Sequence, residues 1–147
     1  MVLHALHLCS GYGGFELALR GTARTVAHVE RDAYAAATLV ARMDEARLDR
    51  APIWSDLTTF DARPWRGRVD IVTAGFPCQP FSAAGQQRGI DDDRWLWPAI
   101  ARIINDVGPR FVVLENVARC APVDECMLTV PASYTFAQSG RPVDAIG

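Results

Sequence analysis

Short apolar runs alternate along this chain with stretches of helical character, and this alternation constrains the fold more than any other feature. Runs of β-strand character cover residues 2–9, 25–29, 52–54, 69–74 and 111–114. Helices are predicted over about residues 15–19, 32–43 and 95–107, with Asp32 as the N-cap of the second. Strands that alternate with helices predict an α/β fold with a doubly wound, mostly parallel sheet.

Polar and glycine positions follow the predicted strands. In doubly wound sheets, ligands bind beyond the carboxyl ends of the strands. Five residues fall just after a predicted strand end: Gly11, Glu30, Asp56, Cys78 and Glu115. We therefore expect these residues to converge at one edge of the sheet.

A glycine turn follows the first strand, in the order Gly11-Tyr12-Gly13-Gly14, and Glu30 could bind ribose hydroxyls nineteen residues after Gly11. A dinucleotide motif would need glycine where the chain has Glu16. A negative side chain where a pyrophosphate would dock favours a nucleoside such as S-adenosylmethionine over NAD. A tight turn without a ligand, or a nucleotide-dependent oxidoreductase, remains an alternative, but an oxidoreductase leaves the sequence Pro77-Cys78-Gln79, further along the chain, unexplained.

A long loop from Gly75 to about Asp93 carries Cys78 between Pro77 and Gln79-Pro80. Loops of this length inside a compact domain are usually functional. A free cysteine is more often a small buried apolar residue than a nucleophile. The flanking prolines restrain the backbone and hold the thiol in one direction, which favours a nucleophile here.

Glu115 ends an entirely apolar strand, and Asn116 and Val117 follow it. We expect its carboxyl group to lie near a low-dielectric core, where its pKa can be raised and it can donate a proton or a hydrogen bond. The alternative is an acid that caps the next turn.

Composition excludes several classes of protein. The chain has 147 residues, enough for one domain, and its formal charge is -2 with scattered arginines, so no concentrated phosphate-binding patch is predicted. The four cysteines form no C-x-x-C pair and have no histidine at metal-ligand spacing, so we expect no metal. No apolar run could cross a membrane and no signal peptide is visible, which predicts a cytoplasmic protein.

Three motifs together resemble the DNA cytosine-5 methyltransferases. They are the segment from Leu8 to Phe15 (LCSGYGGF), the segment from Phe76 to Ser82 (FPCQPFS) and Glu115-Asn116-Val117, in the order and spacing of that family. The resemblance covers about residues 3–117. It implies a Rossmann-like, S-adenosylmethionine-dependent methyltransferase fold and methylation of cytosine in double-stranded DNA, as in host or phage restriction-modification systems.

The resemblance also implies a role for each matching residue. Cys78 would add to carbon 6 of a cytosine flipped out of the duplex, and Glu115 would bind ring nitrogen 3 and help to protonate it. Gln79 and Ser82 would contact DNA. The implied cofactor-binding residues are Cys9, Ser10, Gly11, Gly13, Glu30, Arg31, Asp56, Leu57, Pro77 and Leu96.

The chain departs from the family pattern in three places. His7 and Cys9 stand where the family usually has Asp and Phe, and Arg31 replaces an aromatic residue that commonly stacks on adenine. Beyond Val117, the family continues with further strands and a target-recognition region. We expect residues 118–147 to be an irregular tail without these motifs, beside a catalytic part in residues 1–117 and a sheet incomplete at its C-terminal end. The chain would be an active enzyme, an inactive remnant, or half of a split enzyme whose second chain recognises DNA.

Overall fold

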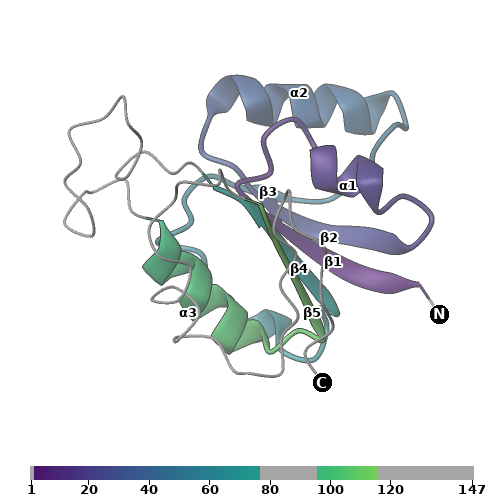
Figure 1. Ribbon diagram of the computed structural model, residues 1–147. Helices are drawn as coiled ribbons and strands as arrows, with labels where there is room; N and C mark the ends of the chain where they lie inside the picture. Colours follow the sequence, from purple (N-terminus) through teal and green to yellow (C-terminus); the bar gives the residue numbers. More distant parts are fainter. Residues whose placement is uncertain (1, 77–95, 116–147) are drawn as a thin grey trace.

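Five parallel strands form the sheet of this protein. The computed structural model describes residues 2–76 and 96–115. The strands are β1 (Leu3–Leu8), β2 (Ala23–Val29), β3 (Ile53–Trp54), β4 (Ile71–Gly75) and β5 (Phe111–Glu115), in the spatial order β3-β2-β1-β4-β5 (Figure 1). Every neighbouring pair is parallel. The predicted parallel, doubly wound α/β sheet is therefore confirmed.

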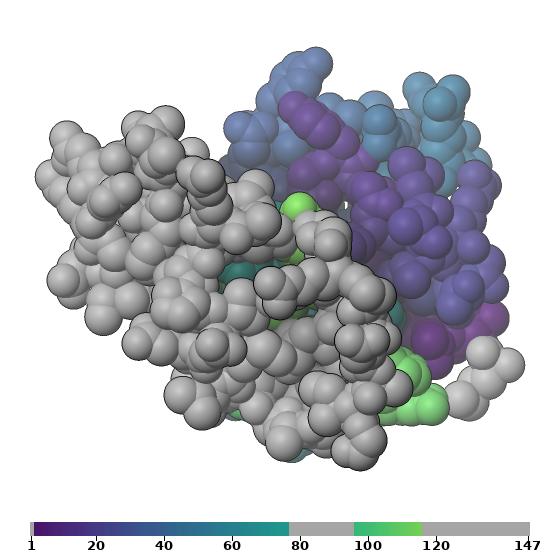
Figure 2. Space-filling view, viewed as in Figure 1, coloured from purple at the N-terminus to yellow at the C-terminus, as the bar shows by residue number. Residues whose placement is uncertain are grey.

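Helices cover both faces of the sheet. Helix α1 (Gly14–Ala18) and helix α2 (Ala33–Asp44) lie on one face, and helix α3 (Trp97–Val107) lies on the other with the short 3-10 helix η1 (Arg63–Trp65) (Figure 1). In Figure 2 the purple and blue atoms of the first half of the chain form a continuous surface on one side of the view. Strand β1 lies at the centre of the strand order β3-β2-β1-β4-β5. The strand order reverses there, and ligands of this fold bind at such a reversal.

The first core packs between the sheet and α3. Ile100, Ile103, Ile104 and Val107 repeat at helical spacing on one face of α3, and all four are fully buried. They pack with residues of the central strands, including Leu6 and Val72. Each buried aliphatic side chain contributes about 1.5–3 kcal/mol. A smaller cluster on the other face consists of Leu39, Met43 and Leu48, with Ile53 packed against it.

Local signals explain where the helices begin and end. The Asp32 carboxylate accepts a hydrogen bond of 2.7 Å from the Ala35 amide, which confirms the predicted N-cap. Gly108 ends α3 in the left-handed conformation, at φ 61°, and its amide donates to the Ile104 carbonyl over 2.9 Å. The predicted strand ends lie within two residues of the observed ones. None of the helices in residues 2–76 and 96–115 could span a membrane.

Some predictions fall outside the described residues. They concern Pro77, Cys78, Gln79 and Ser82 in the long loop, and the irregular tail over residues 118–147. The proposed boundary after Val117 lies there too, and it stays a prediction.

Candidate functional site at the carboxyl edge of the sheet

The turn after β1 is built from residues with positive φ angles. Cys9, Gly11 and Gly13 have φ angles of 50°, 54° and 83°. The left-handed conformation costs little for glycine, so the strand can end and reverse here within a few residues. A Cβ atom at Gly11 would meet nothing within 4 Å, whereas one at Gly13 would lie 2.8 Å from Leu48 Cδ1. Gly11 therefore opens space at the carboxyl edge of β1, and Gly13 allows close packing beneath it.

Glu30 joins this turn to the start of helix α2. Its Oε2 accepts a hydrogen bond of 2.6 Å from the Gly11 amide, and its Oε1 accepts one of 2.7 Å from the Asp32 amide. The side chain is half-buried. Each carboxylate oxygen keeps a lone pair after these bonds, so Glu30 is fixed in place and can still accept hydrogen bonds from two hydroxyl groups.

Asp56 supplies a second acid, beyond the end of β3. Its Oδ1 accepts hydrogen bonds from the Thr58 hydroxyl and amide, over 2.7 and 2.8 Å. These bonds are the main reason why the pKa of Asp56 lies below its ordinary value, and the charge of Arg31 contributes to the same shift. The neighbouring Leu57 side chain is buried in the core. Asp56 and Arg31 thus belong to the edge, while Leu57 faces the interior.

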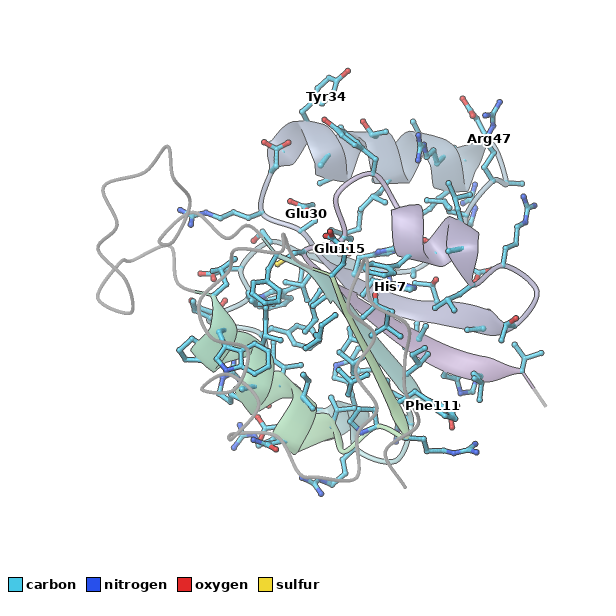
Figure 3. The ribbon with its side chains drawn as sticks, in the orientation of Figure 1. His7, Glu30, Tyr34, Arg47, Phe111 and Glu115 are labelled. Carbon is cyan, nitrogen blue, oxygen red and sulfur yellow. The ribbon has the colours of Figure 1, made fainter. Side chains whose placement is uncertain are left out.

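Glu115 ends β5 beside Gly75, the last residue of β4. The register pairs the two residues directly. A Cβ atom at Gly75 would lie 3.6 Å from Glu115 Oε2 and 3.3 Å from Phe15 Cε2, so glycine leaves room for both side chains. Figure 3 shows Glu115 and Glu30 at the same end of the sheet. The Glu115 side chain is exposed, so the expected low-dielectric surroundings are wrong for this residue.

An aromatic contact joins the described residues on either side of residues 77–95. Phe76 directly precedes residues 77–95 and Trp97 follows them. Both rings are buried, and their centroids lie 6.0 Å apart. The partly buried Leu96 packs against the same core. The described residues that flank residues 77–95 therefore meet beside the carboxyl end of β4.

Cys9 lines the turn as a protonated thiol. Burial raises the pKa of its thiol to about 11, and the charge of Glu30 contributes to the increase. A thiol with this pKa is a poor nucleophile at neutral pH. The predicted role of Cys9 as a residue that lines the cofactor stays a prediction.

A buried polar network beneath the turn was not predicted as part of the site. His7 of β1 lies between two threonine hydroxyls, with Nδ1 2.7 Å from Thr73 Oγ1 and Nε2 3.1 Å from Thr25 Oγ1. Burial and then the neighbouring His28 lower the pKa of His7 to about 4. The His7 ring is therefore neutral at pH 7. The signal in the sequence was the presence of histidine and threonine inside apolar strands.

Glu16 and His28 form the second half of this network. Glu16 Oε2 lies 3.0 Å from His28 Nε2, a close contact whose atoms are not aligned for a full hydrogen bond. Glu16 Oε1 accepts a hydrogen bond of 2.7 Å from the Asp49 amide. Burial acts most strongly on Glu16 and raises its pKa, but His28 and the Asp49 amide together outweigh it, and the net pKa is lowered. The interpretation that Glu16 lies where a pyrophosphate would dock is wrong, because its carboxylate is buried against β2.

The structure thus brings most of the predicted site residues together. The carboxyl ends of the parallel strands place Cys9, Ser10, Gly11, Gly13, Glu30, Arg31, Asp56 and Glu115 at one edge of the sheet. Within residues 2–76 and 96–115, no group of three His, Cys, Asp or Glu side chains could hold a metal ion. The arrangement offers open backbone at Gly11 and carboxylate acceptors on both sides of it, which suits a ligand with several hydroxyl and amino groups.

Comparison with known proteins identifies similar chains. The family described as C-5 cytosine-specific DNA methylase matches residues 3–128. The type II methyltransferase M.NgoMIV of Neisseria gonorrhoeae is 37% identical over 122 residues, which are 80% of this chain and 36% of the relative. M.HhaI of Haemophilus parahaemolyticus is 37% identical over 124 residues, which are 83% of this chain and 36% of that relative. M.PspPI of Psychrobacter is 38% identical over 121 residues, which are 81% of this chain and 28% of that relative. The chain spans about a third of the length of these relatives.

Solved structures agree with this comparison. A putative DNA modification methyltransferase encoded within a prophage of E. coli superposes with a TM-score of 0.66 at 25% identity, covering 87% of this chain and 37% of that one. The structure of DNMT2 from Spodoptera frugiperda superposes with a TM-score of 0.65 at 20% identity and covers 86% of this chain and 39% of that one. At this identity it supports the fold alone.

Proposed function

The chain belongs to the family of C-5 cytosine-specific DNA methylases, and from this we propose that it carries the cofactor-binding and nucleophile-bearing part of an enzyme that methylates carbon 5 of cytosine in DNA. One observation carries the proposal. The turn at Gly11, the fixed carboxylate of Glu30 and the exposed carboxylate of Glu115 lie at the same edge of the sheet, as Figure 3 shows for the two acids. A nucleoside and a base could be held there side by side.

The described residues fit S-adenosylmethionine. Open space above Gly11 admits the ligand close to the backbone, and the free lone pairs of Glu30 accept from ribose hydroxyls. Asp56, which its Thr58 hydrogen bonds keep ionised, would accept from the adenine amino group. When bound, S-adenosylmethionine supplies an activated methyl group on a sulfonium centre.

Cys78 and Glu115 would carry the chemistry on the base. The Cys78 thiolate forms a bond to carbon 6 of cytosine, while Glu115 binds and helps to protonate ring nitrogen 3. Carbon 5 becomes electron-rich and would take the methyl group as the bond between that methyl group and the sulfonium sulfur breaks, which leaves a neutral thioether. Loss of the proton on carbon 5 then returns the electrons to the ring and breaks the bond between carbon 6 and sulfur. Cys78 follows Gly75 by three residues, a span of at most about 11 Å, which supports its action on a base near Glu115.

A second candidate is a chain that binds the cofactor and completes methyl transfer only together with another chain. One observation favours it. Among the described strands, none pairs with the outer edge of β5. An unpaired strand edge readily accepts a further strand.

Methyl transfer and cofactor binding separate these candidates. Purified chain is incubated with S-adenosylmethionine carrying a labelled methyl group and with unmethylated DNA of mixed sequence. Transfer that Cys78→Ser abolishes and Cys120→Ser preserves supports the first candidate. Binding of S-adenosylmethionine without transfer supports the second. A chain that neither binds the cofactor nor transfers the methyl group contradicts both.

Binding also tests the role given to Glu30. The substitution Glu30→Gln removes a charge-assisted hydrogen bond, so the Kd for S-adenosylmethionine should rise about tenfold or more. Glu45→Gln changes an exposed acid beyond the end of α2 and serves as the matched control, with an unchanged Kd expected. Equal affinities of the two variants, measured by calorimetry, would remove Glu30 from the site.

A further inference from the structure

Three consecutive residues at the end of β2 hold the turn that follows β1. The His28 Nδ1 atom lies 3.1 Å from Ser10 Oγ, the Val29 carbonyl accepts a bond of 3.2 Å from the Ser10 amide, and Glu30 Oε2 accepts one of 2.6 Å from the Gly11 amide. We propose that His28 is a positioning residue for the cofactor-binding turn and acts through the Ser10 hydroxyl. This inference rests on the proposed function, because it assigns the turn to S-adenosylmethionine.

The hydrogen bonds of Ser10 define the direction of this link. Ser10 Oγ donates to the His7 carbonyl over 3.0 Å, and a carbonyl oxygen can only accept. Both bonds of the hydroxyl form at once only if His28 Nδ1 is the donor to Ser10 Oγ. The Ser10 side chain is buried and directed into the protein. Its contribution to ligand binding is therefore the placement of the neighbouring Gly11, and not a contact of its own with the cofactor.

His28 can position Ser10 because its own ring is held on two further sides. Glu16 Oε2 lies 3.0 Å from Nε2, and the His7 ring stacks on the imidazole with centroids 5.4 Å apart. The His28 side chain is fully buried. A ring fixed by the Glu16 carboxylate, a stacked neighbour and a hydrogen bond has one orientation, so the position of Nδ1 is defined before any ligand arrives.

A displacement of Ser10 would reach the ligand site directly. Gly11 is the next residue, its amide is bound by Glu30, and the space above it is open. Movement of Ser10 would shift both the Gly11 backbone and the Glu30 carboxylate. The link from His28 to Ser10 should thus affect cofactor affinity although neither side chain lines the open space.

A double-mutant cycle measures this link. In Ser10→Ala the hydroxyl is absent. In His28→Gln the side-chain amide reaches the place of Nε2 and keeps a donor for Glu16, but it leaves Ser10 without its partner. Each variant should weaken the binding of S-adenosylmethionine about fivefold, the fold-change expected for the loss of one hydrogen bond. Because both remove the same link, the double variant should also bind about fivefold weaker. A 25-fold loss in the double variant, or no loss in either single variant, would overturn the proposal.

The variant His28→Asn separates positioning from stability. The Asn amide nitrogen occupies the place of Nδ1 and can donate to Ser10, but Glu16 loses its partner. We expect His28→Asn to be the less stable protein in urea and yet to bind S-adenosylmethionine more tightly than His28→Gln. A merely structural role predicts the reverse order of affinities, and that result would refute the proposal.

The amide NMR signal of Gly11 provides a readout without cofactor. Its chemical shift reports the bond of 2.6 Å to Glu30. The signal should move alike in Ser10→Ala and His28→Gln and return toward its wild-type position in His28→Asn. If the wild-type chain binds no S-adenosylmethionine, the proposed function fails, and this signal alone decides whether His28 positions the turn. A Gly11 signal unchanged in all three variants would show that it does not.

Discussion

The substitution Gly13→Ala should destabilise the protein for two separable reasons. The first is backbone strain, because Gly13 has a φ angle of 83°, in the left-handed region where a side chain costs about 1–2 kcal/mol. The second is a steric clash, because the new Cβ atom would lie 2.8 Å from Leu48 Cδ1 and 3.2 Å from Leu39 Cδ2. Both leucines are buried, so they have little room to move. Overpacking of this kind costs about 1–3 kcal/mol.

Gly21 provides a matched control for the strain. It has the same φ angle of 83°, but a Cβ atom there would meet nothing within 4 Å. We expect Gly21→Ala to lower the free energy of unfolding by about 1–2 kcal/mol, and Gly13→Ala to lower it by about 2–5 kcal/mol, the sum of strain and clash. The difference between the variants measures the clash alone.

Urea unfolding followed by circular dichroism tests this reasoning. The two variants should differ in the midpoint at equal m values. In a Leu48→Ala background the Cδ1 atom is gone, so the difference between Gly13→Ala and Gly21→Ala should shrink. Equal losses of stability in the two single variants would refute the assigned clash. A difference that persists unchanged without the Leu48 side chain would show that the clash lies elsewhere.

Two further predictions follow from the shifted pKa values. The pKa of His7 is about 4 in the folded chain and 6.5 ordinarily, so the unfolded chain takes up the proton first. The stabilising contribution of the neutral His7 ring is complete above pH 6.5 and declines as the pH falls to 4. The free energy of unfolding should therefore drop by about 2 kcal/mol from pH 7 to pH 5. Urea midpoints should show this drop, and its persistence in His7→Asn would contradict the assignment. Because the pKa of Cys9 is raised from 9.0 to about 11, its thiolate population at pH 8 is about a hundredfold lower than in the unfolded chain. Mass spectrometry should find Cys9 alkylated by iodoacetamide much more slowly in the native chain than in urea, and equal rates would disprove this.

Sequence pattern alone predicted the sheet, since it depends on features that are local. Each strand is a short apolar run, and the residues that follow it are polar or glycine. The N-cap at Asp32 could be predicted because an aspartate just before a helical segment favours a hydrogen bond to the first amides of that helix. The convergence of Gly11, Glu30, Asp56 and Glu115 followed because parallel strands share a carboxyl edge.

Side-chain direction could not be predicted in the same way. Glu16 was interpreted from its offset in a glycine motif, but the partner that sets its orientation is His28, on the neighbouring strand β2. Glu115 was expected near a low-dielectric core, yet it ends the edge strand β5 of the described sheet and is exposed. In both cases the deciding contact, or its absence, depends on which strands are neighbours, and periodicity along the chain contains no information on strand order.

The buried network also bears on why polar residues occupy such central positions. Taking the Glu16 carboxylate and the His28 ring out of water costs free energy, and well-packed apolar residues in place of such a buried pair are often equally stable or more so. Stability therefore does not account for the pair. An apolar replacement would have no atom that donates to Ser10 Oγ, whereas His28 contacts Ser10 through Nδ1 and the carboxylate of Glu16 through Nε2 of the same ring. Because His7 stays neutral, it can stack on His28 without adding a buried charge. A core of apolar residues could be at least as stable, but only the polar network holds the turn at the carboxyl edge in one defined orientation.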